Sequence, residues 1–298
     1  MTIKINQLHP CFVAEFADVD LSKPIDDATF KEIVEGMDRH AVGVFHGPTL
    51  TEEQHADYAE RFGPLDPNNG ILSTGLKRRI SPRLADIANL DHENEKFAKD
   101  SRRRMFNLGN QLWHTDSTFK KIPAMYSLLH AHSVAPEGGE TQFCDMRAAY
   151  DALSQKMKDR IENLVAEHSI FTSRMKLGFT EFSEEERALH PPTRRGLVRV
   201  HPGSGRKGLY LASHASHIYG MPVADGKMLL MDLMEHATQR EFVHTHHWKV
   251  GDLVIWDNRC TMHRARPFDD LAFKRDMRRA TVQDLNYPEI TVADEKVA

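Results

Sequence analysis

His114 and Asp116 stand two positions apart in the stretch NQLWHTDSTF, and both side chains can bind a metal ion. The run that leads into them is typical of a strand. Residues i and i+2 of a strand point to the same face, so an imidazole and a carboxylate would converge on one point. The spacing therefore predicts two ligands of a metal site.

A third ligand has to come from elsewhere in the chain. His263 follows an apolar strand and the turn that WDN suggests, in DLVIWDNRCTMHRARPF. Two histidines and one carboxylate on one side of a metal leave three positions open. This arrangement suits non-haem Fe(II), which must hold a co-substrate and O2 together. His114, Asp116 and His263 are therefore the candidate iron ligands.

Among the 18 histidines, three other groupings are weaker candidates. His244 and His246 alternate on an expected strand, where a surface position is the commoner explanation. His214 and His217 would face one way only on a helix, and no carboxylate is near them in the sequence. His236 lies on an expected helix that lacks the second histidine of an HExxH zinc site. None of these groupings by itself predicts a metal site.

Length, charge and cysteine content exclude several classes of protein. The formal net charge of -4 over 298 residues gives no reason to expect a nucleic-acid partner. No apolar run approaches the roughly 20 residues that span a bilayer. The stretch MTIKINQLHP lacks the pattern of a signal peptide, and three scattered cysteines argue against a disulfide framework. We expect a cytoplasmic protein without a membrane partner.

The elements that must position the candidate ligands are mostly strands. Short apolar runs between turn residues predict strands in AMYSLLHAHSV, the end of APEGGETQF, LVRVHP, GLYL, FVHTHHW, DLVIWDN and RRATVQDL. Helices are predicted over 26–40, from a Thr51–Gln54 capping box to Phe62, over 146–164 with Ser154 as a second N-cap, and over 224–239. This content indicates a mainly β fold with covering helices, a double-stranded β-helix or jelly roll, in one domain spanning 1–298.

The segment from Leu72 to Arg104 differs in character from the rest. It carries KRR, RRR and many other charges with little periodicity. A long loop of this kind in a compact domain is either a lid over a functional site or a solvated insertion. The sequence leaves both explanations open.

Four motifs together resemble the TauD/TfdA family of Fe(II)- and 2-oxoglutarate-dependent dioxygenases: WHTDSTF, PEGGETQF, WDNRCTMHRA and RRAT. The resemblance extends from Arg61 to Thr281 and is weakest between Leu72 and Arg104. Within the family, CDMRAAYDAL, HASH, EHATQREFV and VGDLVIWDNRC are most similar to members that act on aryloxyacetates such as 2,4-dichlorophenoxyacetate.

The resemblance implies which residues hold the metal and the co-substrate. His114, Asp116 and His263 would be the iron ligands. Thr141 would hydrogen-bond a carboxylate of 2-oxoglutarate, and Arg275 would hold its distal carboxylate. An arginine matches a carboxylate bidentately and stays charged at any working pH.

The resemblance also places substrate contacts. Arg279 would hold the anionic group of the substrate, and Asn110 would line its pocket. Lys77 is expected to approach the substrate carboxylate from the charged segment. Residues four apart on a strand share a face, so Arg275 and Arg279 can point inward together while Arg278 points out. The alternative is a solvated basic strand end.

The implied reaction is hydroxylation of a small anionic organic acid, with 2-oxoglutarate and O2 consumed and succinate and CO2 released. An aryloxyacetate would give a phenol and glyoxylate. The same chemistry on an alkyl sulfonate, a sulfate ester or another aromatic acid stays open, as does a metal-binding jelly-roll protein without activity. Trp113 and Phe119 are expected to pack in the core. We expect a homo-oligomer.

Overall fold

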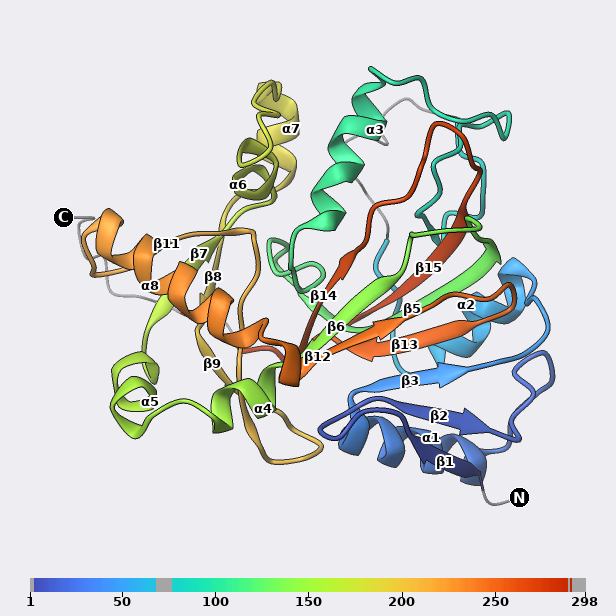
Figure 1. Ribbon diagram of the computed structural model, residues 1–298, viewed down its shortest axis with the longest axis horizontal. Coiled ribbons are helices and arrows are strands. Elements are labelled where there is room, and N and C mark those ends of the chain that lie inside the picture. Colours follow the sequence, from blue (N-terminus) through green and yellow to red (C-terminus); the bar gives the residue numbers. More distant parts are fainter. Residues whose placement is uncertain (1–2, 68–76, 289, 291–298) are drawn as a thin grey trace.

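A seven-stranded sheet forms the centre of the structure (Figure 1). The computed structural model describes residues 3–67, 77–288 and 290. Across the sheet the strands are β1 (Lys4–Gln7), β2 (Ala14–Ala17), β3 (Val42–Phe45), β13 (Leu253–Asp257), β5 (Ala124–Ser133), β15 (Asp276–Gln283) and β4 (Ala85–Asp86). All neighbours are antiparallel except β2 and β3. Strands from both ends of the chain therefore meet within one sheet.

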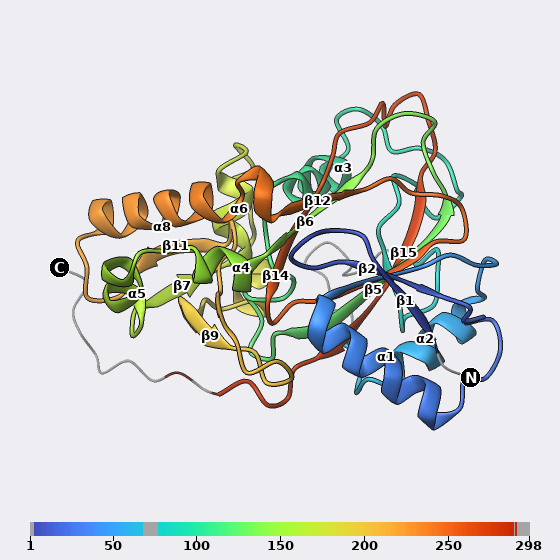
Figure 2. The same cartoon turned by 60° about the horizontal axis from the view of Figure 1, so that its bottom comes forward.

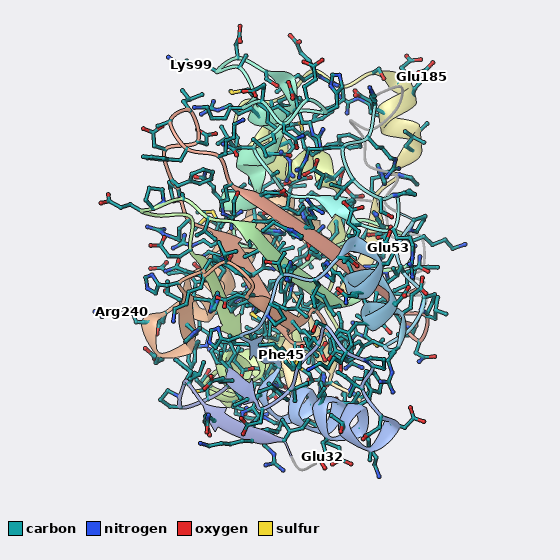
Figure 3. The ribbon with its side chains drawn as sticks, turned by 90° about the vertical axis from the view of Figure 1, so that its right-hand side faces the viewer. Glu32, Phe45, Glu53, Lys99, Glu185 and Arg240 are labelled. Atoms are coloured by element: carbon teal, nitrogen blue, oxygen red, sulfur yellow. The ribbon has the colours of Figure 1, made fainter. Side chains whose placement is uncertain are left out.

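Two helices, α1 (Asp27–His40) and α2 (Glu52–Glu60), cover one face of this sheet (Figures 1 and 2). Their apolar sides pack on Phe16 and Phe45, which are almost fully buried. Figure 3 shows Phe45 in the interior, whereas the other labelled side chains lie at the periphery. Thr51 begins α2 with the expected capping box, which satisfies amide groups at the helix start.

A three-stranded sheet faces the large sheet from the other side. Its strands are β12 (Val243–His246), β6 (Thr141–Asp145) and β14 (Thr261–Ala265). Phe143 of β6 packs against Trp256 of β13, with ring centroids 5.5 Å apart. Both side chains belong to a buried cluster that contains residues of the two sheets. This layer fixes β14 relative to β5 and β15.

Shorter elements complete the second half of the chain. The helices are α3 (Arg102–Asn107), η1 (Leu108–Gln111), α4 (Met146–Asp151), α5 (Gln155–Ile161), α6 (Ile170–Met175), α7 (Glu184–Leu189), α8 (Val223–Ala237) and η2 (Arg240–Phe242). The strands are β7 (Val165–His168), β8 (Thr193–Gly196), β9 (Val198–Val200), β10 (Lys207–Leu209) and β11 (Ala215–Ile218). A separate buried cluster joins α4 and α8 to these strands. No helix among the described residues could cross a membrane.

The expected mainly β content with covering helices is confirmed. The predicted helix over 146–164 is divided in two, and Ser154 caps the second half as expected. The sequence analysis missed β1, β2, β4, β7, β8, β11 and β14, together with α3, α6 and α7. The three helices have six residues each, which is too short for a 3.6-residue period to appear.

The charged segment Leu72–Arg104 is only partly visible, because residues 72–76 lie outside the described residues. The described part is tied down by buried ion pairs. Arg79, whose side chain is 5% exposed, bonds both Asp86 and Asp276. Its end is held where Arg104 pairs with Asp270 at 2.8 Å. The described part is therefore anchored to β15 and the loop before it rather than freely solvated.

Acid should destabilise the fold through buried neutral histidines. Burial lowers the pKa of His55 to about 3 and that of His168 to about 3. Between pH 6.5 and 3 the unfolded chain therefore binds more protons than the folded protein, so stability falls with falling pH. Each histidine contributes up to about 1.4 kcal/mol per pH unit in that window. Thermal unfolding at a series of pH values measures the slope.

His55→Gln keeps a donor for the carbonyl oxygen of Leu128, which the His55 imidazole contacts at 3.0 Å. This variant should unfold with a shallower pH dependence than the wild type. The same replacement of His247, whose side chain is 77% exposed, is the matched control and should leave the slope unchanged. An equal slope in all three proteins would contradict the assignment.

Candidate metal centre and active site

The structure brings His114, Asp116 and His263 together in one buried cluster. One ligand atom from each lies within 4.8 Å of the other two. His114 Nε2 is 3.8 Å from Asp116 Oδ1, and His263 Nε2 is 3.7 Å from Asp116 Oδ2. Each imidazole therefore directs its Nε2 atom toward the space around the Asp116 carboxylate.

The local geometry differs from the expected strand. His114 forms only an isolated antiparallel bridge with His263, in which each backbone N–H donates to the other residue's carbonyl oxygen. Asp116 already lies in a turn, and Ser117 has the left-handed φ of 54°. The hydroxyl hydrogen of Thr115 is shared between the carbonyl oxygens of Leu211 and Thr261, each 3.0 Å away, and this contact fixes the turn. The two side chains converge through this turn, not through the alternation of a strand.

Hydrogen bonding and burial leave both imidazoles ready to act as ligands. His114 Nδ1–H donates to the carbonyl oxygen of Leu112 at 2.7 Å, which leaves the lone pair on Nε2. Burial lowers the pKa of His114, and it lowers that of His263 further. Both rings are therefore neutral near pH 7, which is the ligating form.

Asp116 supplies the negative charge of the cluster. Burial alone would raise the pKa of its carboxyl group, but Arg279 and the two imidazoles hold the pKa below its ordinary value. Arg279 Nη1 lies 2.7 Å from Asp116 Oδ1. Two neutral nitrogens and one carboxylate, with further space beside them, fit Fe(II) of the non-haem type.

A network from the WDN turn orients this carboxylate. Ser127 Oγ–H donates to Asp116 Oδ2 at 2.8 Å, and Asn258 Nδ2–H donates to Ser127 Oγ at 3.0 Å. Asn258 Oδ1 accepts from the Asp116 backbone N–H and from the indole of Trp256. The sequence analysis singled out the WDN turn but assigned no role to Asn258 or Ser127.

Two cavities flank the triad. The first, of about 260 Å³, includes His114, Asp116, Asn110, Lys77, Phe119, Ile170, Arg174, His190, His214 and Arg279 in its lining. The second, of about 320 Å³, includes His263, Thr141, Leu129, Trp256, Phe268, Arg266 and Arg275. His114, Asn110 and Arg279 line both cavities. The candidate metal centre therefore opens to two separate compartments.

The arginines in β15 and just before it point to two different sides, as the alternation of side chains along a strand predicts. Arg275 and Arg279 line the second cavity, whereas Arg278 turns away and pairs with Glu52 at 2.8 Å. Burial lowers the pKa of Arg275 to about 10, and its Nη2–H donates to the Gly139 carbonyl oxygen at 3.2 Å. Thr141 Oγ1 accepts a hydrogen bond from the indole of Trp248.

The other histidine groupings do not form metal sites among the described residues. His246 hydrogen-bonds Asp252, and His236 hydrogen-bonds the Ala149 carbonyl oxygen. The described residues contain one further potential group, around Asp257, but Arg259 already pairs with that carboxylate at 2.6 Å. That cation already balances the charge of the Asp257 carboxylate.

Two aromatic side chains of the first cavity were not predicted there. Phe119 packs against a small buried cluster, as expected, but it also lines the cavity and packs edge-on against His214, with centroids 4.9 Å apart. His214 also contacts the His114 ring, with centroids 5.9 Å apart, without belonging to the triad. The segment HASH gave no sign of this position, because β11 and the loop before it reach the site only through tertiary packing.

A family model described as "Taurine catabolism dioxygenase TauD, TfdA family" matches residues 4–281. The chain belongs to this family. The resemblance drawn from the sequence motifs, and with it the class of dioxygenase, is confirmed. The TauD/TfdA match spans both sheets and all three residues of the candidate metal centre.

Members of the TauD/TfdA family resemble the chain over nearly its whole length. It is 46% identical to an alpha-ketoglutarate-dependent 2,4-dichlorophenoxyacetate dioxygenase of Cupriavidus pinatubonensis, over 95% of this chain and 99% of that protein. It is 37% identical to an (S)-phenoxypropionate/alpha-ketoglutarate dioxygenase of Sphingobium herbicidovorans, over 82% and 83%. The crystal structure of AAD-2 with Mn(II) and N-oxalylglycine matches with a TM-score of 0.92 at 50% identity, covering 95% and 98%.

Loss of the Ser127 hydroxyl should weaken metal binding without abolishing it. Ser127→Ala removes the donor to Asp116 Oδ2, and losing such a partner of a ligating group reduces affinity about tenfold to a hundredfold. Anaerobic titration with Fe(II) measures the effect. His114→Ala should show no binding at this site, and Ser22→Ala, at a half-buried serine whose hydroxyl contacts Asp20, should bind as the wild type does. Unchanged affinity in His114→Ala would remove the metal assignment.

Proposed function

We propose that the protein is an Fe(II)- and 2-oxoglutarate-dependent dioxygenase that hydroxylates an aryloxyacetate such as 2,4-dichlorophenoxyacetate. The products are a phenol, glyoxylate, succinate and CO2. One observation carries the proposal: a buried His–Asp–His cluster lies between two cavities, each lined by buried arginine. Two organic acids could therefore meet at one metal. The relatives named above supply the substrate class.

His114, Asp116 and His263 would hold the iron. When bound, Fe(II) supplies the oxidising chemistry with O2 and 2-oxoglutarate. The protein's contribution is to fix the three ligands, to exclude water and to orient the reacting carbon. Burial of all three ligand residues provides the water exclusion, since each residue is at most 6% exposed.

The second cavity is assigned to 2-oxoglutarate. Arg275 is 6% exposed and has no carboxylate partner among the described residues, so a dicarboxylate would supply the missing charge. Thr141 lies on the same cavity wall and can donate its hydroxyl hydrogen to a co-substrate carboxylate. Leu129 and Trp256 close the apolar part of this compartment.

The first cavity is assigned to the organic acid. Phe119 and Ile170 offer an apolar surface for an aryl ring. Asn110 and Lys77 line the same space, as expected from the sequence. Arg279 already contacts Asp116 through Nη1, and its Nε is buried without a partner, so part of its guanidinium can still reach the substrate anion. Hydroxylation beside the ether oxygen gives a hemiacetal, which collapses to the phenol and glyoxylate.

The finer architecture forms part of the same proposal. The two facing sheets correspond to a double-stranded β-helix, or jelly roll, in a single domain. The described part of the segment expected as a lid, residues 77–104, would be the lid, since it contributes Lys77, Asp86 and Ile87 to cavity walls. A homo-oligomer and a cytoplasmic location stay predictions from the sequence.

Turnover should be coupled to a carboxylate substrate. With Fe(II), 2-oxoglutarate and 2,4-dichlorophenoxyacetate under air, the protein should release succinate and the phenol in equal amounts. A panel that includes an alkyl sulfonate, a sulfate ester and an aromatic carboxylate identifies the preferred acid. If none of these acids leads to succinate release, the proposed reaction is contradicted. If the protein prefers a sulfur-containing acid, the proposed substrate class is contradicted.

Arg275→Gln should separate the two cavities. Loss of a charge-assisted contact to 2-oxoglutarate should raise the KM for this co-substrate about tenfold to a hundredfold, since such contacts contribute about 1.5–3 kcal/mol. The KM for the aryloxyacetate should stay nearly the same. Steady-state kinetics with each compound varied in turn measures both constants. A larger effect on the aryloxyacetate would mean that the assignments of the cavities are reversed.

A further inference from the structure

Arg174 is a buried cation that the reaction as described so far does not use. The buried arginines of the described chain are Arg147, Arg174, Arg195, Arg259 and Arg275. Arg147 and Arg259 pair with aspartates, and Arg195 donates to several backbone carbonyl oxygens. Arg195 has no acid partner either, but carbonyl oxygens accept from its guanidinium, so Arg174 and Arg275 are the buried arginines left with neither an acid nor such a set of carbonyl oxygens among the described residues. Arg275 faces the second cavity, and Arg174 faces the first.

The contacts of Arg174 leave its charge uncompensated. One terminal nitrogen contacts Ser173 Oγ at 3.0 Å, and the other reaches Asn110 Oδ1 only at 3.5 Å. Nε is buried and has no hydrogen-bond partner. Burial lowers the pKa of Arg174 to about 10, so the group is still charged near pH 7. A charge held out of water without a partner is costly unless a ligand anion completes the site.

The backbone makes room for this guanidinium beside the metal centre. Arg174 belongs to α6, and its guanidinium stacks on the Phe106 ring of α3 at 4.3 Å. Figures 1 and 2 show α3 and α6 close together. A Cβ on Gly109 would overlap the guanidinium carbon of Arg174. The contact at Gly139 is less severe, since a Cβ there would lie 3.3 Å from Nε of Arg275. Each unpaired arginine thus lies against a glycine.

The other charges of the first cavity are already paired. Arg279 bonds Asp116, Arg79 bonds Asp86, and Lys120 contacts Asp66 at 2.7 Å. Arg103 lies 3.6 Å from Asp86. Lys77 and Arg78 are exposed and keep their water. Among the described residues of this cavity, Arg174 is therefore the buried cation that has no acid.

We infer that Arg174 binds the carboxylate of the organic-acid substrate and sets the preference of the enzyme for acids over neutral analogues. The inference rests on the proposed function and deepens it. Asn110 positions the guanidinium, Phe106 supports one of its faces, and Arg279 contacts the substrate from the metal side. The planar fork of an arginine matches a carboxylate bidentately. The two acids of the reaction thus each have a buried arginine of their own.

The test compares an aryloxyacetic acid with its amide, which has nearly the same shape but no charge. Wild-type protein should process the acid with a much higher kcat/KM than the amide. Arg174→Gln should raise the KM for the acid about tenfold to a hundredfold, because a charge-assisted contact is lost. The same variant should leave the KM for 2-oxoglutarate and the rate with the amide nearly unchanged. Succinate release measures each of these rates and constants.

Control variants separate the charge from general damage. Arg187→Gln makes the same replacement at an exposed arginine of the neighbouring helix α7, and it should behave as the wild type. Arg174→Lys keeps the charge without the fork and should show a smaller loss than Arg174→Gln. Gly109→Ala should also raise the KM for the acid, because the new Cβ displaces the guanidinium.

The outcomes distinguish two kinds of failure. If Arg174→Gln folds and its KM for the acid equals that of the wild type, the role of Arg174 is overturned, while the proposed reaction stays intact. Equal use of acid and amide by the wild type would overturn it too, even if the variant does not fold. Absence of succinate release from the wild type with every acid would instead remove the proposed function, and this inference with it.

Discussion

The burial of one carboxylate between two imidazoles is the constraint on which the rest of the structure depends. Removing the charge of Asp116 from water costs several kcal/mol unless partners replace the water. Arg279 of β15 and Ser127 of β5 supply such partners, and Asn258 in the turn after β13 accepts from the backbone N–H of Asp116. These three segments are held together by the central sheet and by its apolar layers. The sheet order thus brings these three segments together around one anion.

Charge is distributed around the site in an unequal way. Arg279 is already neutralised by Asp116, so it serves the metal centre first. Arg174 and Arg275 are left uncompensated, and each lies on one side of the triad. In a dry cavity an unpaired cation destabilises the empty protein but strengthens the binding of an anion. If the proposed roles are correct, these two arginines give the site its selection for acids over neutral molecules.

The sequence predicted the parts of the site that carry a local signal. His114, Asp116 and His263 stood out because their types are unusual beside apolar strands, and β5, β13 and β15 are long enough to show their pattern. The strand expected through Asp116 was wrong, since a turn brings the carboxylate to the same place. Arg174 could not be found, because a charged residue in a short helix is ordinarily solvated. Its burial results from packing against Phe106 and Gly109, which no local pattern encodes.

The backbone bridge between His114 and His263 has a consequence for how the site is built. Both amide groups are paired across it, so two of the three ligands are in register before any ion arrives. Such a preorganised pair gives up little conformational entropy when coordination occurs. It also ties the centre to strand register: a slip of one residue in β14 would replace the imidazole with Met262 or Arg264. Insertions near this strand should therefore be far less tolerated than substitutions.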